Sequence, residues 1–267
     1  MIRAETLYQP GQSTIKETLA FPLALGREGR ALQASLGFAF GSGYDSARKS
    51  AGLFLHPNEE SRWNELKFPL RQKSYLLGRR AAKAALAVCY PFSPATEIEI
   101  CNGVFNQPFL SASAPVSAEL SLAHAPDAAV ALVCPEGHPS GVDLELVSAE
   151  RASAASACFA PQEAPILASL SLPESTATFL LWSVKEALGK ALRCGLAVPF
   201  DVLAIKSVEA RDGAYESHFE HFPPFRALSW TLGDHILSIV IPKRTTLAFA
   251  PTPELVSLIR APAATKC

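Results

Sequence analysis

Twice along this chain, a segment with helical periodicity is followed by segments with the alternation of strands. In the first half, apolar residues recur at helical spacing over about 73–88, and strands are predicted over 120–122 and 128–133. In the second half, helices are predicted near 148–159 and 174–193, and strands over 142–147, 202–208, 227–232 and 236–241. Helices that alternated singly with strands would indicate a parallel doubly wound sheet, whereas this grouping favours an α+β fold.

A stretch rich in turn-forming residues, 134–141, lies between the two halves. We therefore divide the chain into an N-terminal half (1–139), a C-terminal half (140–250) and a C-terminal tail (251–267). Residues 1 to about 50 give no readable pattern, and a short strand with Ile98, Ile100 and Val104 is predicted before the boundary. No internal repeat of fixed period is visible in the sequence.

Composition excludes several classes of protein. Of the 267 residues, 49% are hydrophobic and 18% charged, which argues against disorder, and the net charge of −1 argues against a nucleic-acid partner. A membrane helix needs about 20 apolar residues, and the best run here is 128–134. Residues 1–5 include an acid and no apolar core, so we expect no secretory signal. None of the six cysteines forms a C-x-x-C motif, and a cytoplasmic protein is expected.

Asp143 and Glu145 are two residues apart on the strand predicted over 142–147, so both carboxylates project from the same face. Two adjacent carboxylates repel each other, and their burial is unfavourable unless a cation lies between them. A hard divalent cation with oxygen ligands, most simply Mg²⁺, meets this requirement. The alternative is the solvated face of an edge strand, where an Asp-x-Glu pattern is common.

The helix predicted over 174–193 contains Trp182-Ser183-Val184-Lys185-Glu186-Ala187-Leu188-Gly189-Lys190. Trp182, Glu186 and Lys190 follow at intervals of four, so they form one stripe of the helix. An acid between two lysines is compatible with a surface ladder of ion pairs, which stabilises little. It is also compatible with a third metal ligand beside cations placed for a pyrophosphate.

Together, the two segments form a pattern that is far more specific than either segment alone. Gly-Val-Asp-Leu-Glu at 141–145 is followed, 37 residues after Glu145, by the helix segment at 182–190. Phe159-x-x-x-Glu163 precedes that helix, and Gly195-Leu196 follows it. This arrangement resembles the signature of the 4′-phosphopantetheinyl transferases, in particular the surfactin-synthetase-activating (Sfp-type) class. The similarity runs from about residue 55 to residue 205.

The resemblance implies two similar α+β halves related by a pseudo-twofold axis, with coenzyme A bound in the cleft between them. It implies transfer of the phosphopantetheine arm of coenzyme A to a serine of an apo acyl or peptidyl carrier protein, with release of adenosine 3′,5′-bisphosphate. Asp143, Glu145 and Glu186 match the three acids that hold Mg²⁺ against the pyrophosphate. Lys190 matches the lysine that contacts the phosphates, and Lys185 matches the other lysine of the helix. Glu186 is also a candidate base for the attacking serine, directly or through a water.

Basic residues are concentrated in the first half. Between residues 62 and 83 there are seven basic side chains and one acid, Glu65, which suits a polyanionic ligand such as coenzyme A. The alternative is an amphipathic helix whose basic side chains are only solvated. By the resemblance, Arg62 matches the position that reaches the 3′-phosphate, and Arg79 and Lys83 match a Gly-Arg…Lys pattern.

Two motifs depart from the family. Asn106-Gln107-Pro108 stands in place of Gly-Lys-Pro, so that Gln107 puts an amide where the family has a cation that contacts phosphate. Ala123-His124-Ala125 stands in place of Ser-His-Ser and keeps only the histidine, which matches a contact to the coenzyme phosphates. We expect a change in coenzyme affinity and no change in reaction class.

A monomer is expected, because one chain contains both halves of the cleft. A carrier protein with an acidic helix and a serine is expected to dock near residues 155–173, an apolar loop for which core packing is the equal alternative.

Two other functions would use part of the same set of residues. One is a metal-dependent phosphohydrolase that uses the same acids on a nucleotide, and the other is a non-catalytic module that binds coenzyme A without a metal.

Overall fold

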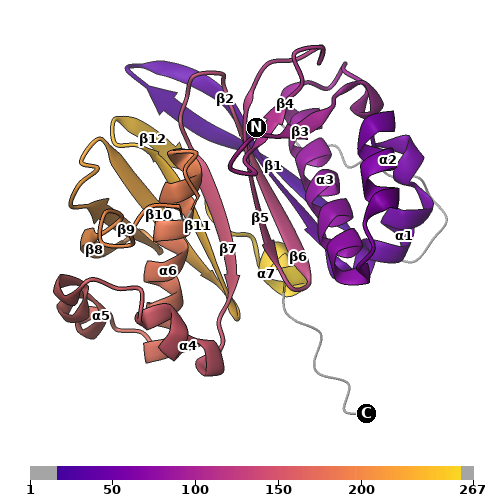
Figure 1. Cartoon of the computed structure of the whole chain (residues 1–267). Helices are drawn as coiled ribbons and strands as arrows, with labels where there is room; N and C mark the ends of the chain where they lie inside the picture. Colours follow the sequence, from indigo (N-terminus) through magenta and orange to yellow (C-terminus); the bar gives the residue numbers. More distant parts are fainter. Residues whose placement is uncertain (1–16, 196, 260–267) are drawn as a thin grey trace.

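The computed structural model describes residues 17–195 and 197–259 (Figure 1). Residues 1–5, for which no secretory signal is expected, lie outside the described residues. So does Leu196 of the Gly195-Leu196 pair. In the described part of the chain, helices combine with two antiparallel five-stranded sheets and one two-stranded sheet, which confirms the α+β class. No helix in these ranges has the length and apolar character needed to cross a membrane.

The first large sheet has the strand order β12-β1-β2-β6-β5. Its strands are β1 (Thr18–Arg27), β2 (Arg30–Phe40), β5 (Glu119–Ala125), β6 (Ala128–Cys134) and β12 (Thr245–Ala248). Glu28 and Gly29 join β1 to β2 with positive φ angles of 51° and 76°, the backbone of a tight two-residue hairpin turn. The edge strand β12 comes from the far end of the chain and pairs with β1, with Leu247 opposite Leu25.

The second large sheet has the order β7-β11-β10-β9-β8. Its strands are β7 (Gly141–Leu146), β8 (Ile205–Arg211), β9 (Ala214–Phe219), β10 (Phe225–Leu232) and β11 (His235–Pro242). A separate pair, β3 (Ile100–Asn102) and β4 (Pro108–Leu110), belongs to the first half. The order β2-β6-β5 in one half corresponds to β7-β11-β10 in the other, and a long helix follows β2 and β7 in each case. The two halves therefore share a topology that the sequence does not show as a repeat.

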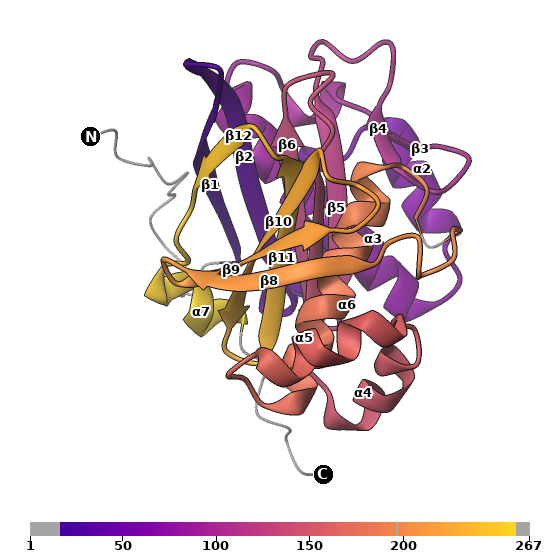
Figure 2. The same ribbon diagram turned by 90° about the vertical axis from the view of Figure 1, so that its left-hand side faces the viewer.

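Each sheet carries a long helix on one face and shares a common core on the other. The helices are α1 (Tyr44–Lys49), α2 (Pro57–Glu65), α3 (Pro69–Cys89), α4 (Ala149–Ser156), α5 (Ala164–Ser169), α6 (Glu174–Ala191) and α7 (Pro253–Ile259). Helix α3 packs on the first sheet and α6 on the second, and α4 and α5 lie beside α6 (Figure 2). The alternation of β6 explains its fully apolar sequence: Val130 and Leu132 face the common core, whereas Ala129 and Ala131 face α3.

The two halves meet where β5 and β7, each at the edge of its sheet, lie side by side (Figure 1). The backbone N–H of Val142 in β7 donates to Ser121 Oγ in β5 at 3.0 Å. Both residues are buried, so this hydrogen bond joins the halves in the interior.

The structure differs from the sequence-based expectations in several places. The short strand ends at Asn102, and Val104 lies in the following loop with 96% of its surface exposed, which corrects its assignment to a strand. Helix α3 begins at Pro69, four residues before the predicted start, because proline suits the first turn of a helix. Strands β1, β2, β4, β9 and β12 had no counterpart in the prediction. In the predicted tail, α7 buries Leu255 and Ile259 in the common core.

Candidate functional site

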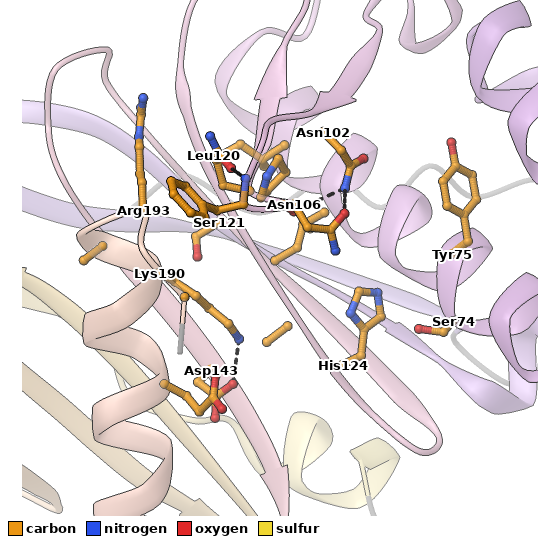
Figure 3. Close-up of a pocket in the computed structure, with 18 of the residues that line it drawn as sticks. Ser74, Tyr75, Asn102, Asn106, Leu120, Ser121, His124, Asp143, Lys190 and Arg193 are labelled. Carbon is orange, nitrogen blue, oxygen red and sulfur yellow. Dashed lines mark hydrogen bonds and ion pairs between the residues drawn. The ribbon is translucent and has the colours of Figure 1, made fainter. Parts of the chain in front are cut away.

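A cavity of about 600 Å³ lies between the two halves, along the junction of β5 and β7 (Figure 3). Helices α2, α3 and α6, the loop between β3 and β4, and the segments just before β7 and just after α6 also contribute to its wall. Of the ten ligand candidates from the sequence, eight line it: Arg62, Arg79, Gln107, His124, Asp143, Glu145, Glu186 and Lys190. The other two, Lys83 and Lys185, lie elsewhere in buried ion pairs.

Strand β7 supplies two of the carboxylates. Val142 and Leu144 point into the common core, so the alternation of the strand turns Asp143 and Glu145 toward the cavity. Asp143 Oδ1 accepts a hydrogen bond from Lys190 Nζ at 2.7 Å (Figure 3), whereas its Oδ2 is buried and has no partner among the described residues. A buried carboxylate oxygen without a partner is unfavourable and indicates room for a further ligand.

Helix α6 supplies the third carboxylate and confirms the predicted stripe. Trp182 Nε1 donates to Glu145 Oε1 at 3.0 Å, and Glu186 and Lys190 line the cavity one and two turns further along. Burial, and then the negative charge of Asp143, raise the pKa of Glu186 to about 7. Burial and Asp143 also raise the pKa of Glu145. The three acids therefore repel one another in a partly desolvated site.

These acids fit a hard divalent cation in their chemistry. Three carboxylates, one with an unpartnered oxygen, are the donors that Mg²⁺ prefers. Within the ranges that the structure describes, no group of three or more His, Cys, Asp or Glu side chains is placed so that it could hold a metal ion as it stands. The three acids would therefore have to move closer together to share one. The Lys190 ammonium accompanies Asp143, and Arg151 Nη1 lies 3.9 Å from Glu145 Oε2, so both cations offset part of the negative charge of the acids.

The N-terminal half contributes cations and amides. Arg79 is buried with its Nε 3.0 Å from the Glu59 carboxylate, and it donates to Asn102 Oδ1, so its charge is already compensated. Gln107 accepts a hydrogen bond from the backbone N–H of Phe105 at 2.9 Å and thereby holds the loop between β3 and β4. Arg62 is exposed at the cavity wall and forms no ion pair within the described residues.

His124 lies in β5 against the middle of α3. A Cβ built on Gly78 would come within 2.4 Å of His124 Nε2, so only glycine at this position of α3 leaves room for the ring. The ring is open to the cavity but surrounded by protein and by cations. Desolvation, followed by Lys190 and Arg79, lowers the pKa of His124 to about 4. The imidazole is therefore neutral at neutral pH.

This environment predicts how the histidine titrates. In the ligand-free protein, the ring proton signals of His124, assigned by comparison with His124→Gln, should show no protonation until the pH falls to about 4 rather than the ordinary 6.5. Bound adenosine 3′,5′-bisphosphate should raise this pKa, because an anion beside the ring stabilises the imidazolium. The measurement is an NMR pH titration with and without the nucleotide. A midpoint near 6.5 in the free protein would contradict the assigned environment.

Lys185 was expected to contact the coenzyme, and the structure places it away from the cavity. The side chain is fully buried on the other side of α6. Its Nζ donates to Glu163 Oε2 at 2.6 Å and to the Phe200 carbonyl oxygen at 3.1 Å. Consecutive residues of a helix point about 100° apart, so Lys185 faces away from the cavity that Glu186 lines.

The same buried ion pair occurs in the first half. Glu59 Oε2 lies 3.0 Å from Lys83 Nζ in α3, as Glu163 Oε2 lies beside Lys185 in α6. Each glutamate also accepts from the backbone N–H at a helix start and from that of a strand residue, Ile100 or Ile205. The segments Leu-His-Pro-Asn-Glu at 55–59 and Phe-Ala-Pro-Gln-Glu at 159–163 are therefore structural equivalents.

Sequence reasoning missed other residues of the cavity wall. These are Ser74 and Tyr75 of α3, Asn102 of β3, Ser121 of β5 and Arg193 after α6. Arg71, which belongs to the predicted basic stretch at 62–83, and Asn106 of the Asn106-Gln107-Pro108 motif also line the cavity. The others come together only through the tertiary fold.

The fold and the site define an α+β protein with a cleft that combines basic side chains with a group of acids. The model of the 4′-phosphopantetheinyl transferase superfamily (ACPS) matches residues 139–240, which contain Asp143, Glu145, Glu186 and Lys190. This part of the chain is therefore similar to that superfamily. No curated protein sequence matches the chain.

Two solved structures are similar to part of the chain. One is a holo-(acyl-carrier-protein) synthase from Bacillus anthracis str. Ames in complex with CoA (3′,5′-ADP), with 22% identity, a TM-score of 0.34, and coverage of 43% of this chain and 96% of that chain. The other is holo-[acyl-carrier-protein] synthase (AcpS) of Thermotoga maritima, with 19% identity, a TM-score of 0.31, and coverage of 46% of this chain and 69% of that chain.

Proposed function

We propose that this protein transfers the phosphopantetheine arm of coenzyme A to a serine of an apo acyl or peptidyl carrier protein. The serine Oγ forms a bond to the β-phosphorus of the coenzyme, the bond from that phosphorus to the bridging oxygen breaks, and adenosine 3′,5′-bisphosphate leaves. One observation carries the proposal: in a chain with the superfamily match, acids from β7 and α6 line one cavity together with cations from both halves. We assign the Sfp-type class on the two-half layout.

Asp143, Glu145 and Glu186 would hold Mg²⁺, which would neutralise charge on the pyrophosphate when bound. Phosphoryl transfer depends on positioning and on compensation of negative charge, and the surrounding residues are placed for both. Trp182 orients Glu145 by its hydrogen bond. Lys190 would give up its present contact with Asp143 and contact a phosphate instead. Glu186 would accept the serine proton, directly or through a water.

The N-terminal half would hold the nucleotide end of coenzyme A. Arg62, exposed on the wall and without a carboxylate partner in the described ranges, would reach the 3′-phosphate. His124 would contact the phosphates from the opposite strand. Arg79 and Gln107 would act mainly through the loop between β3 and β4, because their polar atoms bind Asn102 and Phe105.

The carrier protein would dock on the N-terminal side of the cavity. In the loop expected to receive it, Phe159, Ile166, Leu167, Leu170 and Leu172 pack against the core under α6, so the core-packing alternative accounts for these residues. Large exposed apolar side chains lie instead near the cavity wall, with Phe68 at 71% and Phe105 at 61% exposure, and basic Lys67 and Arg71 lie beside Phe68. A surface of this kind suits an acidic helix.

We further propose a monomer, because one chain provides both walls of the cavity, and a cytoplasmic location. The five cysteines among the described residues are free, as expected in a reducing compartment.

The function is tested by mixing the purified protein with coenzyme A, Mg²⁺ and apo carrier domains from fatty acid, polyketide and peptide synthesis, followed by intact-mass measurement. We expect a mass gain of one phosphopantetheine group on a carrier, and no gain when EDTA replaces Mg²⁺. Hydrolysis of coenzyme A in the absence of a carrier would instead indicate a phosphohydrolase. Binding of coenzyme A that is unaffected by EDTA, without modification of any carrier, would indicate a binding module.

A further inference from the structure

Helix α6 ends in a turn with an unusual backbone. Arg193 has a φ of 56°, in the left-handed region that side chains with a Cβ adopt at an energetic cost and glycine adopts freely. Its N–H donates to the Lys190 carbonyl oxygen at 3.1 Å, and Gly195, two residues later, also has a positive φ. An arginine at a position that favours glycine suggests that its side chain has a role.

The side chain of Arg193 crosses from one half of the molecule to the other. Its guanidinium forms an ion pair with Glu119 at the start of β5, while Arg193 itself follows α6. The arginine side chain is 58% exposed, and it lines both the main cavity and a second, adjoining cavity bounded by residues 108–120. It is therefore accessible to a ligand in either cavity.

Arg193 is also the second cation of the α6 wall. Lys190 and Arg193 are three residues apart, and both line the main cavity. Figure 3 shows Lys190 directed to Asp143 and Arg193 directed away from that acid, along the rim. The two cations therefore cover different parts of the cavity, and an anionic ligand longer than one phosphate would meet both.

We propose that Arg193 is an anion-binding residue that leaves Glu119 to bind a phosphate group of the nucleotide in the main cavity. This inference rests on the proposed function for the identity of the ligand. A guanidinium presents two parallel N–H donors to a phosphate, which matches the geometry of its present carboxylate partner. Arg193 is 58% exposed and so need not be buried unpaired in either state. Glu119 is only 20% exposed, and when the arginine leaves it keeps the hydrogen bond that it accepts from the backbone N–H of Gly137 at 3.2 Å.

The test is calorimetric titration of adenosine 3′,5′-bisphosphate into the full-length protein and three variants. Arg193→Gly should weaken binding about tenfold, through loss of one charged hydrogen-bonding group at an exposed site. Its thermal unfolding temperature should not fall, because glycine suits the positive φ of this position. Arg193→Lys should give an intermediate affinity, since it keeps the charge and loses the paired donors. Glu119→Gln should bind at least as tightly as the unmodified protein, because it removes a competing carboxylate from the wall.

Two results would overturn the inference alone: equal binding by Arg193→Gly and the unmodified protein, or an equal loss of affinity in Glu119→Gln and Arg193→Gly. The second result would show that the ion pair acts only as a brace between the halves. Failure of the unmodified protein to bind the nucleotide would overturn the proposed function and this inference together.

Discussion

Replacement of Asp143 by asparagine should lower the rate of carrier modification by about a thousandfold. The substitution keeps the shape of the side chain and removes one of three carboxylates proposed to hold Mg²⁺. Loss of metal-assisted charge compensation corresponds to several kcal/mol of transition-state stabilisation, and about 4 kcal/mol is a thousandfold in rate. The measurement is kcat/KM for coenzyme A with a saturating carrier, at several Mg²⁺ concentrations.

The fold of this variant should be retained, because the substitution also relieves repulsion between Asp143 and the other two acids. That repulsion adds to burial, the larger cause, in raising the pKa of Glu186. Asp212→Asn is the matched control. Asp212 lies at the tip of the β8–β9 hairpin with its side chain 94% exposed, and asparagine tolerates its positive φ of 50°. Activity within about threefold of the unmodified protein for Asp143→Asn would refute the role of this acid.

Replacement of Lys185 by methionine should destabilise the protein by about 3–5 kcal/mol, because it leaves the Glu163 carboxylate buried without its cation. Both side chains are fully buried, and their contact at 2.6 Å has no access to water that could screen the remaining charge. The free energy of unfolding, from urea titration followed by circular dichroism, is the measurement. In the fraction that folds, the KM for coenzyme A should be unchanged, since Lys185 does not line the cavity.

The control for this prediction is Lys206→Met. Lys206 forms an exposed pair with Glu220 on the second sheet, with Nζ 3.8 Å from the carboxylate, and such pairs contribute about 0–1 kcal/mol. A raised KM in Lys185→Met, with stability equal to that of the control, would restore the original expectation that this lysine contacts the coenzyme.

Much of the second half could be predicted from the sequence, because its elements are long and strongly patterned. The alternation over 142–147 predicts that Asp143 and Glu145 face away from the core, and the helical spacing of Trp182, Glu186 and Lys190 predicts one shared face. Their convergence on one cavity needs the fold, because it depends on how α6 lies across β7. Lys185 shows the limit of motif reasoning: adjacent residues on a helix point in different directions, and a motif match does not say which one faces a ligand.

The secondary structure of the first half was harder to predict from the sequence. Strands β1 and β2 contain glycine, alanine and proline, which weaken strand signals, and they form because they pair with each other and with β6. Strand β12 has only four residues and is specified by its partner β1. The sequence also does not reveal that Glu59 and Glu163 are equivalent. The two glutamates have the same hydrogen bonds and the same burial, but the residues around them in the sequence differ.

The pairing of β12 with β1 has a consequence for biosynthesis. Strand β1 is synthesised long before Thr245–Ala248, because the rest of both halves lies between them in the sequence. Until β12 is synthesised, the backbone N–H and C=O groups on the outer edge of β1 have no strand partner and can pair with neighbouring nascent chains. The first half cannot complete its sheet while it is being made, so the whole polypeptide, rather than either half, is the unit that reaches the native state.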